Sequence, residues 1–160
     1  MAIREKTTIT MRMTGTVLSH SRTDVGIRGL TQVIDEPLER GGTNQGFSPT
    51  ETFAASLIGC TSVISQKIAH KNGLNLRIDH IRLEAQFDRR GVTLQDDVAV
   101  PFPAMTLHID AATDATEAQM DQLRAELTMY CPIAKLVRAS GTELTEIWNL
   151  TPLPATQVGA

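Results

Sequence analysis

Cysteine is scarce in this 160-residue chain, in which Cys60 and Cys131 are the only two. Two thiols cannot build the disulfide framework that stabilises many small secreted domains. Aromatic residues are also few, with four Phe, one Tyr and one Trp, which disfavours a surface on which nucleic-acid bases stack. Lys and Arg are scattered and the formal net charge is -3, so the sequence lacks the basic patch of a nucleic-acid-binding protein.

The sequence also lacks an apolar run near its start, where Met1 to Thr10 includes Arg4, Glu5 and Lys6. We therefore expect neither a signal peptide nor a transmembrane segment, and we expect a cytoplasmic protein with no membrane partner. In the cytoplasm, a disulfide between two cysteines is more often transient, and catalytic or sensing, than structural. The length fits one domain, residues 1–160, with a substantial core.

The clearest boundary in the sequence is the start of a helix at Ser48. Ser48 can cap the helix, Pro49 suits its first position, and Glu51 at the third position completes a capping box. We expect the helix to run to a stop at Gly73. Apolar residues fall on most of its circumference, so the helix should be buried on nearly all sides.

Alternating apolar and β-branched residues predict strands on both sides of this helix. The predicted strands before the helix pair as a hairpin and are followed by a loop rich in Gly, Pro and charge. After it, a second capping box at Thr116–Gln119 opens another helix, which Pro132 restarts or kinks. The expected fold is an α+β domain with a mainly antiparallel sheet. The strands are expected at 8–18, 24–34, 77–88, 104–110 and 143–150, and the loop at 35–47.

The long apolar helix also bears on oligomeric state. One sheet and one short helix are too little to cover all sides of such a helix in a domain of this size. A second subunit would supply the missing cover. We therefore expect a homodimer.

The two cysteines are the candidate reactive groups, because a thiolate is the nucleophilic form and a helix N-terminus or a nearby Arg favours it. Cys131 directly precedes Pro132, so we expect unpaired N–H groups of a helix start to stabilise its thiolate. Cys60 lies about three turns inside its helix and needs a cation from elsewhere. Arg40 is the first candidate for that cation and Arg28 the second. Alternatively, both cysteines are small core hydrophobes, since Cys is among the most buried residue types.

Three segments carry a resemblance to a known family. They resemble the OsmC/Ohr family of thiol peroxidases, in its broader OsmC-like branch, over the central helix, the second cysteine segment and the order of the strands. The resemblance implies an α+β fold of mainly antiparallel sheets with a long buried central helix, in an intertwined homodimer whose active sites lie near the subunit interface. The matching segments are Gly41-Gly42-Thr43, Ser48-Pro49-Thr50-Glu51-Thr52-Phe53-Ala54-Ala55-Ser56-Leu57-Ile58-Gly59-Cys60 and Cys131-Pro132-Ile133-Ala134-Lys135-Leu136.

The resemblance also implies an activity. In this family the first cysteine, here Cys60, attacks a peroxide and becomes a sulfenic acid, and the second, here Cys131, condenses with it to a disulfide. The chain is thus expected to be a peroxidase for organic hydroperoxides, with hydrogen peroxide as a second candidate substrate. An external dithiol such as a lipoyl group is the expected reductant. The resemblance implies no metal and no bound organic cofactor.

The chain departs from the family at Thr50. Members with firm hydroperoxide activity carry Glu at this position, where it orders an Arg against the thiolate, whereas here Glu51 follows one step later. One residue turns about 100° around a helix, so Glu51 does not point where the family's Glu points. Glu51 is either only the capping-box partner of Ser48 or a catalytic carboxylate that orients Arg40. If Glu51 does not orient it, Arg40 is a solvated charge in the loop. This departure leaves two alternatives to the peroxidase. One is a non-enzymatic redox sensor or small-ligand-binding protein, and the other is a structural dimer with inert thiols.

Overall fold

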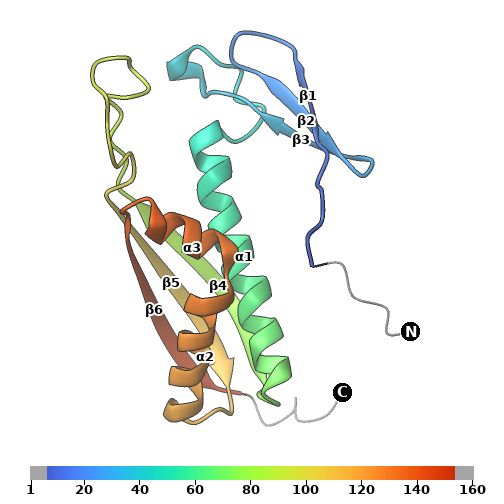
Figure 1. The fold of residues 1–160 in the computed structure, drawn as a ribbon, viewed down its shortest axis with the longest axis vertical. Helices are drawn as coiled ribbons and strands as arrows, with labels where there is room; N and C mark the ends of the chain where they lie inside the picture. Colours follow the sequence, from blue (N-terminus) through green and yellow to red (C-terminus); the bar gives the residue numbers. More distant parts are fainter. Residues whose placement is uncertain (1–6, 154–160) are drawn as a thin grey trace. The chain divides into compact units, whose positions relative to one another are not determined.

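The computed structural model describes residues 7–153 of the chain, in ten short elements (Figure 1). They form two compact units, divided between Phe53 and Ala54 inside the longest helix. Small sheets and helices alternate along the chain, which confirms the predicted α+β class. The elements are β1 (Thr14–Val17), β2 (Thr23–Ile27), β3 (Leu30–Ile34), a 3-10 helix (Leu38–Arg40), α1 (Pro49–Lys71), β4 (Leu76–Ala85), β5 (Ala104–Thr113), α2 (Glu117–Tyr130), α3 (Pro132–Ala139) and β6 (Glu143–Pro152).

The first unit contains an antiparallel sheet of order β1-β2-β3. The expected hairpin is present as β1 and β2, but the prediction of one continuous strand over 24–34 is wrong. Arg28 and Gly29, at φ 52° and 78°, form a turn that separates β2 from β3. Positive φ at both central residues is the conformation of a type I′ turn, whose twist matches that of the two strands it joins. No residue of this sheet is buried.

The second unit contains a sheet of order β4-β5-β6. β4 and β5 are antiparallel, whereas β5 and β6 are parallel along their whole length. A parallel pair needs a long crossover, which α2 and α3 provide here. The sequence predicted one mainly antiparallel sheet. The structure has two sheets, in which every strand pair is antiparallel except β5 with β6.

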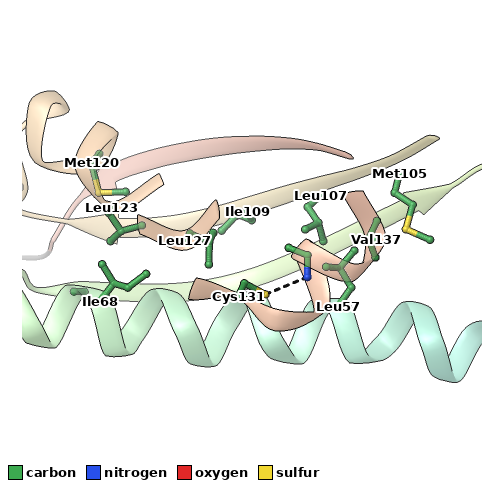
Figure 2. Close-up of a cluster of buried hydrophobic side chains, with 12 residues drawn as sticks. Leu57, Ile68, Met105, Leu107, Ile109, Met120, Leu123, Leu127, Cys131 and Val137 are labelled. Atoms are coloured by element: carbon green, nitrogen blue, oxygen red, sulfur yellow. Dashed lines mark hydrogen bonds between the residues drawn. The ribbon is translucent and has the colours of Figure 1, made fainter. Parts of the chain in front are cut away.

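The core of the second unit lies between its sheet and its helices (Figure 2). The buried β5 residues Met105, Leu107 and Ile109 alternate along the strand and so point to one face, which α1, α2 and α3 cover. α1 contributes one stripe that includes Leu57 and Ile68. The rest of α1 is less covered, and Val63 is 52% exposed. The expectation that this helix is buried on nearly all sides is therefore not met among the residues that the structure describes. The fully buried large side chains of the cluster also include Met120, Leu123, Leu127 and Val137.

Candidate active site

Helix α1 fixes the position of Cys60. At its start the Ser48 N–H donates to Glu51 Oε2 at 2.8 Å, and the Glu51 N–H donates to Ser48 Oγ at 3.4 Å. At its end Gly73 adopts φ 66° and its N–H donates to the carbonyl of His70 at 3.2 Å. Both boundaries predicted from the sequence are confirmed. Cys60 consequently lies in the middle of a long, capped helix.

Cys131 is held at the junction of two helices. It is the C-cap of α2 and the N-cap of α3, with Pro132 at the first position of α3. Its N–H donates to the carbonyl of Leu127 at 2.9 Å, and its sulfur accepts a hydrogen bond from the Ala134 N–H at 3.4 Å, which is drawn in Figure 2. Pro disfavours helical dihedrals in the residue before it, so the chain must break at Cys131 and restart. The restart predicted at Pro132 is confirmed.

The structure brings the two cysteines together although 71 positions separate them in the sequence. Cys131 Sγ donates to Cys60 Sγ at 3.0 Å, and both are free thiols. A disulfide bond is about 2.05 Å long, so the sulfurs need to approach by only about 1 Å to form one. Cys131 is 0% exposed, whereas Cys60 is only partly buried at the margin of the core. A small molecule in solvent therefore reaches Cys60 first.

Burial controls the ionisation of Cys131. It raises the pKa of this thiol to about 11, and the hydrogen bond to Cys60 acts in the same direction. The Ala134 N–H at the start of α3 lowers the pKa, but its effect is smaller. The N–H groups of the helix start thus favour the Cys131 thiolate as expected, but desolvation outweighs them and the net shift of the pKa is upward. At neutral pH Cys131 is a thiol.

Arg40 and Glu51 both belong to the first unit, and Glu51 lies in the first turn of α1. Glu51 acts as the capping-box partner of Ser48, and the hydrogen bond from the Ser48 N–H lowers the pKa of the Glu51 carboxyl. Arg40 Nε lies 2.6 Å from Glu36 Oε2. The sequence analysis missed Glu36, although its spacing of four residues from Arg40 is a recognisable signal. Catalytic roles for Glu51 and Arg40 remain predictions.

A buried carboxylate organises the loop that carries Arg40. Asp35 Oδ2 accepts hydrogen bonds from the Thr43 N–H, the Thr43 hydroxyl and the Gln45 N–H. These bonds lower the pKa of Asp35 to about 2, the Thr43 hydroxyl having the largest effect. A Cβ atom at Gly42 would overlap the Glu36 carbonyl, so this position requires Gly. The segment 35–47, predicted as a loop, is a loop that contains one short 3-10 helix and is held by the hydrogen bonds to Asp35.

The structure has neither a candidate metal site nor a candidate membrane span among the residues that it describes. Within residues 7–153, no three His, Cys, Asp or Glu side chains gather closely enough to ligate a metal ion. None of the helices in that range combines the length and hydropathy needed to cross a bilayer.

The chain was compared with curated proteins, with solved structures and with models of sequence families. No curated protein matches the sequence. Among solved structures, an OsmC-like protein from Mycoplasma pneumoniae is 13% identical with a TM-score of 0.68, and the match covers 91% of this chain and 99% of that one. An organic hydroperoxide resistance protein OsmC from Legionella pneumophila is 16% identical with a TM-score of 0.59, over 91% and 99% of the two chains. The organic hydroperoxide resistance protein OhrB of Bacillus subtilis is 16% identical with a TM-score of 0.56, over 88% and 98%.

These structural matches establish the fold, whereas a match to a sequence-family model establishes family membership. The model described as OsmC-like protein matches residues 42–146, which include Cys60, Cys131 and all of α1. Apart from Gly41, those residues also contain the segments on which the resemblance was based. The chain belongs to the OsmC-like protein family.

Proposed function

We propose that the chain is a thiol-dependent peroxidase for organic hydroperoxides, with Cys60 as the nucleophile and Cys131 as the resolving thiol. The observation that carries this proposal is the pair of free thiols 3.0 Å apart, one partly exposed and one buried. The family supports a role related to redox chemistry or peroxides, and two structural relatives are named as organic hydroperoxide resistance proteins. Hydrogen peroxide is a second candidate substrate.

The proposed reaction has two steps in the protein. The Cys60 thiolate attacks one peroxide oxygen and the O–O bond breaks, which gives a Cys60 sulfenic acid and an alcohol. The Cys131 sulfur then attacks the Cys60 sulfur, the S–O bond breaks and water leaves, which gives a disulfide. The two electrons that reduce the peroxide come from the two thiols. An external dithiol, such as a lipoyl group, restores both thiols by exchange.

The surroundings of Cys60 favour an organic peroxide over a small polar one. Cys60 packs at the edge of the apolar core, with Leu57 and Ile64 on the same helix in the same cluster. Apolar groups gain free energy when they leave water, so an alkyl or aryl group on the peroxide contributes to binding there. Arg40 and Glu51 remain candidate catalytic residues, to be tested by substitution in the same assay.

We also propose that the protein is a cytoplasmic homodimer. Apolar side chains are exposed in both units, among them Val17 at 73%, Leu30 at 62% and Val63 at 52%. We infer that a second copy covers side chains of this kind, because apolar groups gain free energy when they leave water. Two free, closely spaced thiols are suited to a reducing compartment, where a disulfide is a transient state.

One observation favours a second candidate function, a non-enzymatic redox sensor. Thr50 stands where the active branches of the family have Glu, and its hydroxyl lies 3.2 Å from the Ser48 hydroxyl at the helix cap. A cysteine pair without an activating Glu–Arg pair would oxidise slowly. A sensor of this kind forms the Cys60–Cys131 disulfide reversibly but does not consume peroxide at a useful rate.

The test is peroxide consumption by the purified protein. Cumene hydroperoxide and hydrogen peroxide are supplied with dihydrolipoamide, and wild type is compared with Cys60→Ser, Cys131→Ser and Ser62→Ala, a control on the same helix. The proposal expects turnover in wild type and the control, none in Cys60→Ser, and a preference for cumene hydroperoxide. Wild-type protein that forms a disulfide without turnover would instead support the sensor.

A further inference from the structure

A buried carboxylate joins the last turn of α2 to the end of α1. Glu126 is 8% exposed, and three side chains donate to its carboxylate. Lys71 Nζ lies 3.1 Å from Oε2, and the amides of Asn72 and Gln122 lie 3.2 Å and 3.0 Å from Oε1. Gln122 is on the same helix, whereas Lys71 is the last residue of α1 and Asn72 follows it. The cation that neutralises this buried charge therefore comes from α1.

The same lysine also contacts the residue that precedes the second cysteine. Lys71 Nζ lies 5.5 Å from the centre of the Tyr130 ring, which is within the range of a cation–π interaction. Tyr130 is about one turn after Glu126 and directly before Cys131. Lys71 thus contacts both ends of the last turn of α2, at the point where this helix stops.

The lysine and the sulfurs fix α2 along α1 at two separate points. On α1, Lys71 lies about 16 Å beyond Cys60 along the helix. On α2, Glu126 precedes Cys131. The later residue of α1 meets the earlier residue of α2, so the two helices are antiparallel, as the order of the side chains in Figure 2 shows. A shift of α2 along α1 would therefore separate the sulfurs and break the contacts of Lys71 together.

Resolution of a sulfenic acid depends on this alignment. The sulfurs of Cys60 and Cys131 lie 3.0 Å apart, and the chain breaks between α2 and α3 at Cys131, so the place of its sulfur depends on where α2 ends. Reactions between groups that a protein holds in place are sensitive to small displacements. A displacement of about 1 Å can cost about a hundredfold in rate.

We propose that Lys71 and Glu126 are positioning residues for Cys131, and that their ion pair keeps its sulfur within reach of Cys60. This inference rests on the proposed function for the peroxide step, but not for disulfide formation itself. The pair touches no reacting atom. An ion pair with a buried member adds little net stability, because desolvation offsets the attraction, so its contribution here is a fixed helix position.

The test measures how strongly the protein favours its disulfide when no peroxide is present. In a glutathione buffer, two protein thiols and one glutathione disulfide exchange with the Cys60–Cys131 disulfide and two glutathione thiols. Alkylation and mass spectrometry give the equilibrium constant for disulfide formation. Lys71→Met should lower this constant by about tenfold, because α2 is then free to shift along α1.

Two further lysine variants serve as the rescue and the control. Lys71→Arg keeps the charge and should hold the constant within about threefold of wild type. Lys67→Met removes an exposed lysine one turn earlier on α1 and should leave the constant unchanged.

A double variant separates position from stability. Lys71→Met with Glu126→Leu replaces the ion pair by apolar side chains, a change that often leaves stability unchanged or raises it. Its melting temperature should be no lower than that of Lys71→Met, whereas its constant for disulfide formation should stay about tenfold below that of wild type. After a single turnover with cumene hydroperoxide, dimedone should trap more Cys60 sulfenic acid in both variants than in wild type.

Three outcomes would overturn the inference. A wild-type constant in Lys71→Met and in the double variant would show that the disulfide forms equally well without the ion pair. A loss in Lys71→Arg as large as in Lys71→Met would show that the charge does not set the position. A constant that the double variant regains would assign the loss to an unpaired buried carboxylate. If the constants change as expected but the wild-type protein never consumes peroxide, the positioning role is supported and only the proposed peroxidase is wrong.

Discussion

At the level of single residues, exposure divides the roles of the two sulfurs. Cys60 is partly exposed and lies inside a helix, whereas Cys131 is fully buried and keeps its proton. The sequence allows Cys131 to be placed at a helix start, because Pro132 follows it. It does not reveal how far the surrounding core desolvates the sulfur. That quantity depends on how the side chains of the core pack around Cys131, and it reverses the expected ionisation.

The first prediction concerns alkylation of the reduced, native protein by iodoacetamide at pH 7. Cys60 should react and Cys131 should not, because the raised pKa of Cys131 makes its thiolate about a hundredfold rarer than that of a thiol with the ordinary pKa of 9.0. Peptide mapping of the labelled protein measures both rates, and labelling in urea should modify both residues. Equal rates for the two cysteines in the native protein would contradict the assignment.

The second prediction concerns Asp35 and pH. Hydrogen bonds lower the folded-state pKa of Asp35 from 3.8 to about 2. The stabilisation is therefore complete above about pH 4 and is lost as the pH falls towards 2, since the unfolded state binds the proton first. Asp35→Asn should lower the urea midpoint at pH 7, and its difference from wild type should shrink between pH 4 and pH 2.

The exposed Asp97 provides the control for this measurement. Asp97→Asn should leave the urea midpoint close to that of wild type across the same pH range. A difference between wild type and Asp35→Asn that stays constant down to pH 2 would show that the charge of Asp35 does not stabilise the fold.

At the level of elements, the structure agrees with the sequence where short-range hydrogen bonds decide the outcome. Ser48 and Thr116 each start a helix through a capping box, as their residue types and spacing predict. The turn at Arg28 and the parallel pairing of β6 could not be predicted in this way, because no capping residue or spacing marks either of them. Arg28 adopts positive φ although Arg gives no signal for it, and alternation along β6 does not reveal that it pairs in parallel with β5.

The third prediction separates the two roles considered for Glu51. Ser48→Ala should destabilise the protein by about 1 kcal/mol, because it removes the acceptor at the start of α1. Glu51→Gln keeps an acceptor for the Ser48 N–H, so its urea midpoint should stay within error of wild type and its turnover within about threefold. Gln66→Ala, at an exposed position of the same helix, is the control. A large loss of turnover in Glu51→Gln, with stability unchanged, would instead assign Glu51 a catalytic role.

At the level of the whole molecule, each of the two units lacks cover for some of its own apolar side chains among residues 7–153. The sheet of β1, β2 and β3 has no buried residue, and Val63 on α1 is half exposed. The sequence already indicated this shortage, because α1 is apolar around most of its circumference. It did not indicate that the chain divides into two units with separate sheets, since strand patterns do not specify which strands pair.

The fourth prediction follows from this surface. Size-exclusion chromatography with light scattering should give twice the mass of the 160-residue chain. Val17→Asp should shift the protein towards monomer, because a buried charge without a partner opposes association. Val92→Asp, at a position that is 62% exposed in the loop between β4 and β5, should remain a dimer. A wild-type protein that is monomeric at all concentrations would contradict the proposed homodimer.

The most direct test of the peroxidase account is a titration of the reduced protein with cumene hydroperoxide in the absence of any reductant. One equivalent should convert both thiols to a single Cys60–Cys131 disulfide and release one equivalent of cumyl alcohol, because the two sulfurs already lie 3.0 Å apart. Free-thiol counting, peptide mapping and chromatography of the alcohol measure the three quantities. Protein that keeps both thiols while the hydroperoxide remains intact would contradict the account.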